Sequence, residues 1–316
     1  MTAAFLFPGQ GSQSAGLLHH LPPHAEVTRT IREASDVLGP EFDSLDTAEA
    51  LESTAAVQIS LLIAGVATAR ALLAEQVHPV AVAGMSVGAF GAAVACGTLA
   101  FTDALPLVRR RGELMETAFP SGYGLAAVQG LNEVQMQGIV ERTRTADLPV
   151  YISNINAPRQ IVVAGSDAAL EAVTAQARQQ GARRTVRLAL SVPSHCPLLQ
   201  PVADRLEQLM AQLPLRRPSL PYVSNRGGRA LYDADAIRRD LATNVAHPVR
   251  WYDALEVVSE LGATVFIEMA PGHVSTSLVA ELLPEVKAVS ITDKGLRYAT
   301  VLAARGRLRN SEEPRT

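Results

Sequence analysis

Short apolar runs alternate with longer helix-like stretches along most of the chain. Residues 3–7, 80–83 and 265–268 are short runs of small, β-branched and aromatic residues, which are typical of buried strands. Between them lie segments whose apolar positions recur every three or four residues, such as the helix expected to start at Phe101 with Thr102 as its N-cap. This alternation predicts an α/β fold built around a parallel sheet.

The middle of the chain changes character at a short glycine-rich linker, Gly122-Tyr123-Gly124. The residues that follow alternate strand-like and helix-like segments in the order βαββαβ, which is the order of a ferredoxin-like domain. The sequence therefore predicts an inserted ferredoxin-like subdomain at residues 121–190, and a core that combines residues 1–120 with 191–316. The charged segment after Leu308 is predicted to be disordered.

Composition narrows the possible functions. The chain has 316 residues, of which 48% are hydrophobic and 19% charged, and its formal net charge is −3. This weak negative charge and an aromatic content of 4% argue against nucleic-acid partners. The two cysteines, Cys96 and Cys196, lack metal-ligand spacing, which indicates a reducing compartment and no zinc site. No basic start of a signal peptide is visible, so we expect a cytoplasmic protein.

The uncharged segment at residues 79–102 is long enough to span a bilayer. Pro79 and several glycines interrupt it, and no basic residues flank its start. Both features argue against a single spanning helix, so we expect no membrane association.

A serine between a strand and a helix carries the clearest chemical signal. The string Gly84-Met85-Ser86-Val87-Gly88 separates the strand-like run from a helix of small residues. Gly-x-Ser-x-Gly in this setting is typical of a nucleophilic serine, because only small residues fit beside so sharp a turn. The amide of Val87 then points to where an oxyanion would form. The alternative is an ordinary turn with a solvated serine.

Two glutamines are further candidates. The loop at residues 8–13 follows the first strand and lacks the lysine of a phosphate-binding loop. With Gln10 it is either a wall of an active site or a plain turn. Gln58 is a single polar residue in an apolar stretch, so it is either a site residue or, as we favour, a structural hydrogen-bond partner.

Arg111 shares the apolar stripe of its predicted helix with Leu107 and Val108. An arginine on an inward face needs an anionic partner, because burying it unpaired is costly. The pattern alone favours an internal ion pair with Glu113 or Glu116 over a fork for a substrate carboxylate.

A nucleophilic serine also needs a base within hydrogen-bond reach. His195, His247 and His273 lie in loops between predicted elements. The prolines that bracket His195 restrict its position and favour it as the base. Glu268, at a strand end, occupies the position expected for the acid of a catalytic triad.

Together these motifs resemble the malonyl-CoA:acyl-carrier-protein transacylase family. The matching segments follow the family order and cover nearly the whole chain. They are Phe7-Pro8-Gly9-Gln10-Gly11-Ser12-Gln13, Gly84-x-Ser86-x-Gly88, Arg111-Gly112, Asn154-x-Asn156 with Gln160-Ile161-Val162, Ser194-His195-Cys196 and Pro248-Val249-x-Trp251. The resemblance implies a hydrolase-like α/β core that carries the ferredoxin-like insert.

The resemblance also implies roles at the reacting centre. Ser86 would take the acyl group and His195 would be the base. Arg111 would hold the free malonyl carboxylate. This role takes the place of the internal ion pair that the pattern alone favours. The amides of Gln10 and Val87 would form the oxyanion hole.

Other candidates would support this centre. The backbone carbonyl of His247, just before the Pro-Val pair, would orient the base in place of an acid, which leaves Glu268 structural. Gln58 and Asn154 are expected as supporting residues, and no metal site is expected.

Three short segments depart from the usual family pattern. His247 stands where the family usually has asparagine, Met85 where it usually has histidine, and Ala89-Phe90 where it often has Glu-Tyr. The last two departures, with Tyr123, are more similar to the malonate decarboxylase epsilon subunit. The favoured acceptor is then the phosphoribosyl-dephospho-CoA arm of the malonate decarboxylase carrier subunit, and the alternative is a phosphopantetheine carrier of fatty-acid or polyketide synthesis.

The implied enzyme is a ping-pong acyltransferase that uses malonyl-CoA, a malonyl-serine intermediate and no permanently bound cofactor. A serine thioesterase or hydrolase, with water as acceptor and Glu268 as triad acid, is one rival. A non-catalytic malonyl-binding subunit is another, and the presence of Ser86, His195 and Arg111 argues against it.

Overall fold

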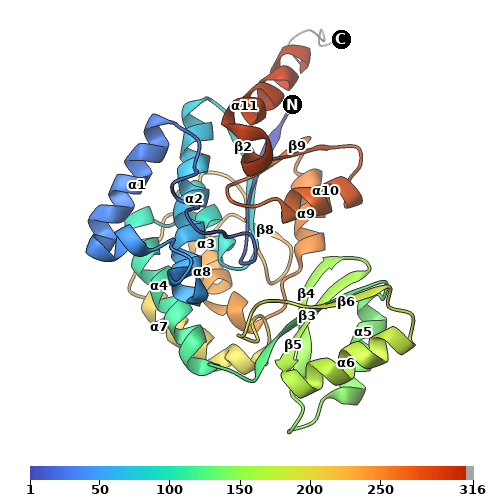
Figure 1. Cartoon of the computed structure of the whole chain (residues 1–316). Helices are drawn as coiled ribbons and strands as arrows, with labels where there is room; N and C mark the ends of the chain where they lie inside the picture. The colour runs from blue at the N-terminus through green and yellow to red at the C-terminus, as the bar shows by residue number, and fades with distance from the viewer. Residues whose placement is uncertain (311–316) are drawn as a thin grey trace.

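Two sheets organise the molecule, a mostly parallel one in the core and an antiparallel one beside it (Figure 1). The structure, a computed structural model, describes the backbone of residues 1–310 and the side chains of residues 1–304. The core sheet has six strands in the order β10-β9-β1-β2-β7-β8, and neighbouring strands are parallel except β7 and β8. They are β1 (Ala3–Phe7), β2 (Pro79–Gly84), β7 (Tyr222–Val223), β8 (Ala230–Leu231), β9 (Val265–Glu268) and β10 (Lys287–Ser290). The predicted α/β class is confirmed.

Helices cover both faces of the core sheet, because successive residues of a strand point to opposite sides. On β1, Phe5 and Phe7 belong to one buried cluster, whereas Ala4 and Leu6 belong to another. The core helices are α1 (Ala25–Leu38), α2 (Thr54–Ala74), α3 (Gly88–Ala95), α4 (Phe101–Ala118), α7 (Gln200–Met210), α8 (Ala234–Thr243), α9 (Trp251–Glu260), α10 (Val274–Leu282) and α11 (Ile291–Asn310). The core also contains short 3₁₀ helices, which are η1 (Gly39–Ser44), η2 (Ala50–Glu52), η3 (Pro197–Leu199) and η4 (Asn244–Ala246).

The uncharged segment at residues 79–102 is not one helix, because it contains β2, the turn at Ser86, α3 and the start of α4. Within the described part of the chain, α2 is long and apolar enough to cross a membrane, but 83% of its most apolar window is buried inside the protein. Ser53 caps this helix by accepting a hydrogen bond from the amide of Ala56 at 3.4 Å. Helix α2 is therefore a buried helix of the core.

The second sheet has the predicted βαββαβ element order. Its strand order is β4-β5-β3-β6, and all its pairs are antiparallel. The elements are β3 (Tyr123–Gln129), α5 (Glu133–Thr143), β4 (Val150–Ala157), β5 (Gln160–Ser166), α6 (Asp167–Gln179) and β6 (Arg184–Arg187). One face packs on α5 and α6, and the other lies over Cys196 and Leu198 of the loop that returns to the core (Figure 1).

Some local predictions are wrong. Helix α4 begins after Ala100, which makes no side-chain cap, so Thr102 lies inside the first turn. Helix α11 has no counterpart in the prediction, and its helical backbone is interrupted at Gly295, which has φ 77°. Of the segment after Leu308 that was predicted to be disordered, residues 311–316 lie outside the described residues.

The antiparallel sheet is attached to the core through β4. The amide of Ile155 donates to the carbonyl of Val249 at 2.9 Å, and the amide of Val249 donates to the carbonyl of Ser153 at 2.8 Å. The hydroxyl of Ser153 also lies 3.0 Å from the carbonyl oxygen of Ser194. Strand β4 therefore touches two core segments, at residues 194 and 249, that are distant in sequence.

Candidate active site

Ser86 lies at the sharp turn between β2 and α3, with φ 54°. This left-handed conformation is strained for a residue with a side chain, and such strain is common at functional turns. Close packing requires the flanking glycines: a Cβ on Gly84 would lie 2.1 Å from the backbone of Gly88, and a Cβ on Gly88 would lie 2.3 Å from the carbonyl oxygen of Phe7. The predicted turn is present, and it is wedged against the end of β1.

Asn225 holds this turn from the neighbouring strand. Its Oδ1 accepts from the amide of Ser86 at 2.9 Å, and its Nδ2 donates to the carbonyl of Gly84 at 2.7 Å. The side chain is 2% exposed and follows β7, the parallel neighbour of β2. Asn225 was not among the predicted site residues, although a polar residue at the carboxyl end of a strand is a usable signal.

His195 contacts the serine directly. Its Nε2 lies 2.7 Å from the Oγ of Ser86. The ring is buried, the backbone has φ 62°, and the amide donates to the carbonyl of Val245 at 2.7 Å. Burial, together with the smaller effect of the positive charge of Arg111, lowers the pKa of His195 to about 4. A neutral imidazole beside a hydroxyl is the state that a general base requires.

A backbone carbonyl orients the imidazole from its other side. His195 Nδ1 lies 2.7 Å from the carbonyl oxygen of Asn244. The carbonyl of His247 was expected in this place, but the hydrogen bond of Nδ1 is made with the carbonyl of Asn244, three residues earlier. The main partner is Asn244.

Arg111 is buried, and among the described residues no acidic side chain pairs with it. Its side chain is fully buried, and it donates to Gln58 at 2.6 Å, to the Oγ of Ser86 at 3.2 Å and to Asn244 Oδ1 at 3.5 Å. Glu113 pairs with Arg110 instead. The internal ion pair that the pattern favoured is absent among the described residues. Burial lowers the pKa of Arg111 to about 9, so it remains a cation at neutral pH.

Gln58 links the arginine to the loop after β1. Its Oε1 accepts from Arg111, and its Nε2 donates to Gln10 Oε1 at 3.1 Å. Gln58 is fully buried, and its hydrogen bonds place it in contact with the group around Ser86. Gln58 therefore makes the structural hydrogen bonds that we favoured, and these same bonds join it to the candidate site.

Two backbone amides lie near the serine and make no hydrogen bond within the described residues, those of Gln10 and Val87. Val87 is the N-cap residue of α3, where the helix dipole favours negative charge. The loop of Gln10 is close to the turn, because a Cβ on Gly9 would lie 3.0 Å from the carbonyl oxygen of Met85. This arrangement can stabilise an oxyanion.

Two candidates make their contacts elsewhere. Glu268 accepts hydrogen bonds from the amides of Ser275 and Thr276, at 3.1 and 2.7 Å, at the start of α10. No hydrogen bond joins it to His195 among the described residues, so the position expected for a triad acid is not used as one. Asn154 lies on β4, where its Oδ1 is 2.7 Å from the hydroxyl of Ser153.

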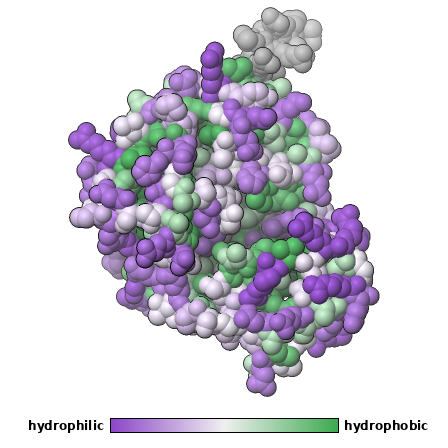
Figure 2. Space-filling view, viewed as in Figure 1, coloured by the Kyte–Doolittle hydropathy of each residue, from purple (hydrophilic) through white to green (hydrophobic). Residues whose placement is uncertain are grey.

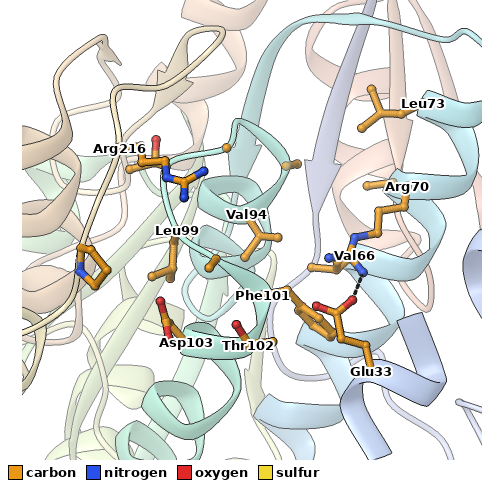
Figure 3. A pocket seen from close by; sticks show the side chains of 16 residues that line it. Glu33, Val66, Arg70, Leu73, Val94, Leu99, Phe101, Thr102, Asp103 and Arg216 are labelled. Atoms are coloured by element: carbon orange, nitrogen blue, oxygen red, sulfur yellow. Dashed lines mark hydrogen bonds and ion pairs between the residues drawn. The ribbon is translucent and has the colours of Figure 1, made fainter. Parts of the chain in front are cut away.

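The surface is hollowed between the core helices and the antiparallel sheet, and apolar residues line that hollow (Figure 2). A separate cavity of about 450 Å³ lies at the far end of α3 (Figure 3). There Arg70 pairs with Glu33 at 2.6 Å on one side, and Arg216 lies on the other. None of the residues around Ser86 lines this cavity. In the described part of the chain, no group of three or more His, Cys, Asp or Glu side chains could hold a metal ion.

A serine and a buried histidine, held on an α/β core, are equipped for acyl transfer. The family model of the acyl transferase domain matches residues 4–294. The class is therefore that of the acyl transferases.

Within this class, the chain belongs to the malonyl CoA-acyl carrier protein transacylase family. It is 36% identical over 299 residues to the malonyl CoA-acyl carrier protein transacylase of Haemophilus influenzae, covering 92% of this chain and 95% of that protein. The crystal structure of an acyl-carrier-protein S-malonyltransferase from Burkholderia pseudomallei is 36% identical, with a TM-score of 0.89 over 95% of this chain and 100% of that one. A malonyl-transacylase in complex with a type II PKS acyl-carrier protein is 33% identical, with a TM-score of 0.89 over 97% of this chain and 100% of that chain.

Proposed function

We propose that this protein moves a malonyl group from malonyl-CoA to the thiol of an acyl carrier protein, through a malonyl ester on Ser86. One observation carries the proposal. The Oγ of Ser86 lies 2.7 Å from His195 and 3.2 Å from the guanidinium of Arg111, which has no carboxylate partner among the described residues. A serine and a base transfer any acyl group, whereas a buried cation beside them favours one with its own carboxylate.

In the first half-reaction, the Oγ of Ser86 attacks the carbonyl carbon of the malonyl thioester, and its proton moves to His195 Nε2. The amides of Gln10 and Val87 hold the oxyanion, and removing one such donor typically costs about 3 kcal/mol. The intermediate then collapses, the C–S bond breaks and the CoA sulfur takes the proton from His195. The products are the malonyl ester of Ser86 and free CoA.

The second half-reaction runs in the opposite direction with a different thiol. The thiol of the carrier arm gives its proton to His195 and attacks the ester carbonyl. The C–O bond to Ser86 breaks, and the serine recovers its proton from His195. Both half-reactions exchange one acyl bond for another, so malonyl-CoA and the carrier arm act as substrates and no resident cofactor takes part.

The rival functions differ in their acceptor and in their use of Glu268. A triad hydrolase would need an acid against His195, but Glu268 bonds the start of α10 and the Asn244 carbonyl occupies Nδ1. A non-catalytic malonyl-binding subunit would use Arg111 but would have no need of the hydrogen-bonded pair of Ser86 and His195. The geometry therefore favours transfer over both.

For the acceptor, we propose an acyl carrier protein with a phosphopantetheine arm. The relatives are named for transfer to an acyl carrier protein, and one was solved with a type II PKS carrier. The malonate decarboxylase carrier stays the second candidate on the strength of Met85, Ala89-Phe90 and Tyr123. Ala89 and Phe90 are fully buried, however, so they cannot contact an arm that enters from the surface. We also propose that residues 121–190 form one subdomain beside the hollow through which the arm would enter.

Intact-mass analysis after mixing with malonyl-CoA tests the proposal. We expect one malonyl adduct in the wild type and in Ser121→Ala, an exposed control, and none in Ser86→Ala. Glu268→Gln, if folded, should still form the adduct, because Glu268 does not contact the base. Release of free malonate at the rate of acylation, in the absence of a carrier, would indicate a hydrolase instead.

A further inference from the structure

Asn244 lies where the base and the arginine meet. The residue is fully buried. Its backbone carbonyl accepts from His195 Nδ1 at 2.7 Å, and its side-chain Oδ1 accepts from Arg111 at 3.5 Å. One residue therefore contacts both partners of Ser86, through two different groups.

The other half of this side chain has no partner. Asn244 Nδ2 is buried without a hydrogen bond among the described residues, and so is Arg111 Nε. The amide cannot be turned around, because its NH₂ group would then face the donors of the guanidinium. Buried donors in folded proteins are nearly always satisfied. Two unpaired donors beside one nucleophile therefore indicate that an acceptor binds there.

We infer that Asn244 determines acyl specificity, and that its Nδ2 donates a hydrogen bond to the free carboxylate of the acyl group that Arg111 binds. The inference rests on the proposed malonyl transfer. A carboxylate has two oxygens with about four acceptor positions, enough for the guanidinium and the amide together. A neutral acyl group such as acetyl has no acceptor besides its thioester carbonyl.

A neutral amide is well suited to this second donor position. Another cation would disfavour the imidazolium that forms when His195 takes the proton of Ser86. An acid would pair with Arg111 inside the protein and repel the substrate carboxylate. Asparagine donates a hydrogen bond without either effect.

The direct test compares malonyl-CoA with acetyl-CoA in Asn244→Ala, which removes the donor but keeps the backbone carbonyl that bonds His195. We expect the malonyl-to-acetyl ratio of kcat/KM to fall by about fivefold or more, as for loss of a hydrogen bond to a charged group. Asn244→Asp places a carboxylate against Arg111, and the ratio should fall further, by about a hundredfold. The added charge also raises the pKa of His195, but this affects both acyl groups alike and cancels in the ratio.

Two controls test whether the effect is specific to position 244 and whether it depends on Arg111. Asn132→Asp makes the same chemical change at the exposed N-cap of α5, and it should keep the wild-type ratio. In an Arg111→Ala background, Asn244→Ala should change the ratio much less than in the wild type, because the carboxylate is no longer anchored beside the amide. An equal fall in both backgrounds would mean that Asn244 acts independently of the arginine, and the inference would be wrong.

The wild-type adduct distinguishes the two levels of failure. If malonyl forms an ester on Ser86 and Asn244→Ala keeps the wild-type ratio, only the role of Asn244 is wrong. If no adduct forms, the proposed function fails and the inference fails with it.

Discussion

His195 is a buried histidine, and its environment sets the pH range in which it can act. Burial lowers its pKa to about 4, and the charge of Arg111 contributes in the same direction. A general base must be neutral to accept a proton. As the pH falls, His195 therefore stays competent until the pH approaches 4, well below the range of an exposed histidine.

This property gives a prediction for the pH profile. We expect kcat/KM for malonyl-CoA to be level from neutral pH downward and to fall as the pH drops through about 4. In Arg111→Ala one cause of the lowered pKa is removed while burial remains, so the acid limb should move to higher pH. Acetyl-CoA as the substrate of both enzymes separates this shift from loss of carboxylate binding. An acid limb at the ordinary histidine value of 6.5 in the wild type would contradict the assignment.

At the scale of elements, the serine turn is held by a strand as well as by its own glycines. Asn225 at the end of β7 bonds both sides of the turn between β2 and α3. We expect Asn225→Ala to slow acylation by about tenfold or more and to lower the free energy of unfolding by about 2 kcal/mol, because it leaves two buried backbone groups unpaired. Rapid-quench measurement of the malonyl adduct and urea unfolding would check the two effects.

Tyr222→Phe is the matched control for this prediction. It removes the hydrogen bond of 2.7 Å to Asp240, which also bonds the amide of Asn225, but it leaves the turn itself untouched. Its stability should fall while the acylation rate stays close to the wild-type value. Equal slowing in both variants would show that Asn225 acts through general stability.

At the scale of the whole molecule, the carrier arm has to reach Ser86 past two sheets. Figure 2 shows the hollow between the core and the antiparallel sheet from its open side. Strand β4 of the antiparallel sheet makes hydrogen bonds to core residues 194 and 249. The antiparallel sheet is therefore connected to the core next to His195, the base. We therefore expect the acceptor to be selected at the junction of the two parts, where its arm would enter.

An acceptor competition tests this selection. Malonyl-loaded enzyme would be offered carrier with a phosphopantetheine arm and carrier with the phosphoribosyl-dephospho-CoA arm, and transfer would be followed by mass spectrometry. We expect faster transfer to the phosphopantetheine carrier, because Ala89 and Phe90, two of the residues that favoured the longer arm, are fully buried and cannot contact it. A clear preference for the longer arm would instead support the decarboxylase branch that the sequence motifs favoured.

The sequence alone determined those features that depend on neighbours along the chain. The period of apolar residues predicted the α/β class and the βαββαβ order, because strands and helices bury side chains with different spacing. The Gly-x-Ser-x-Gly string predicted the turn at Ser86, since its steric demands lie within five consecutive residues. The prolines around His195 were likewise visible locally.

Only the tertiary structure decided which distant groups meet. Asn225 lies 139 positions from Ser86, and Asn244 lies 49 positions from His195. The same holds for Arg111, which the pattern paired with a nearby glutamate but which bonds Gln58 across 53 positions. Glu268 bonds the next helix instead of the base. Helical and strand periods specify which face of an element is buried, but the partner on the other side is set by how the sheets and loops pack, and no local pattern contains that information.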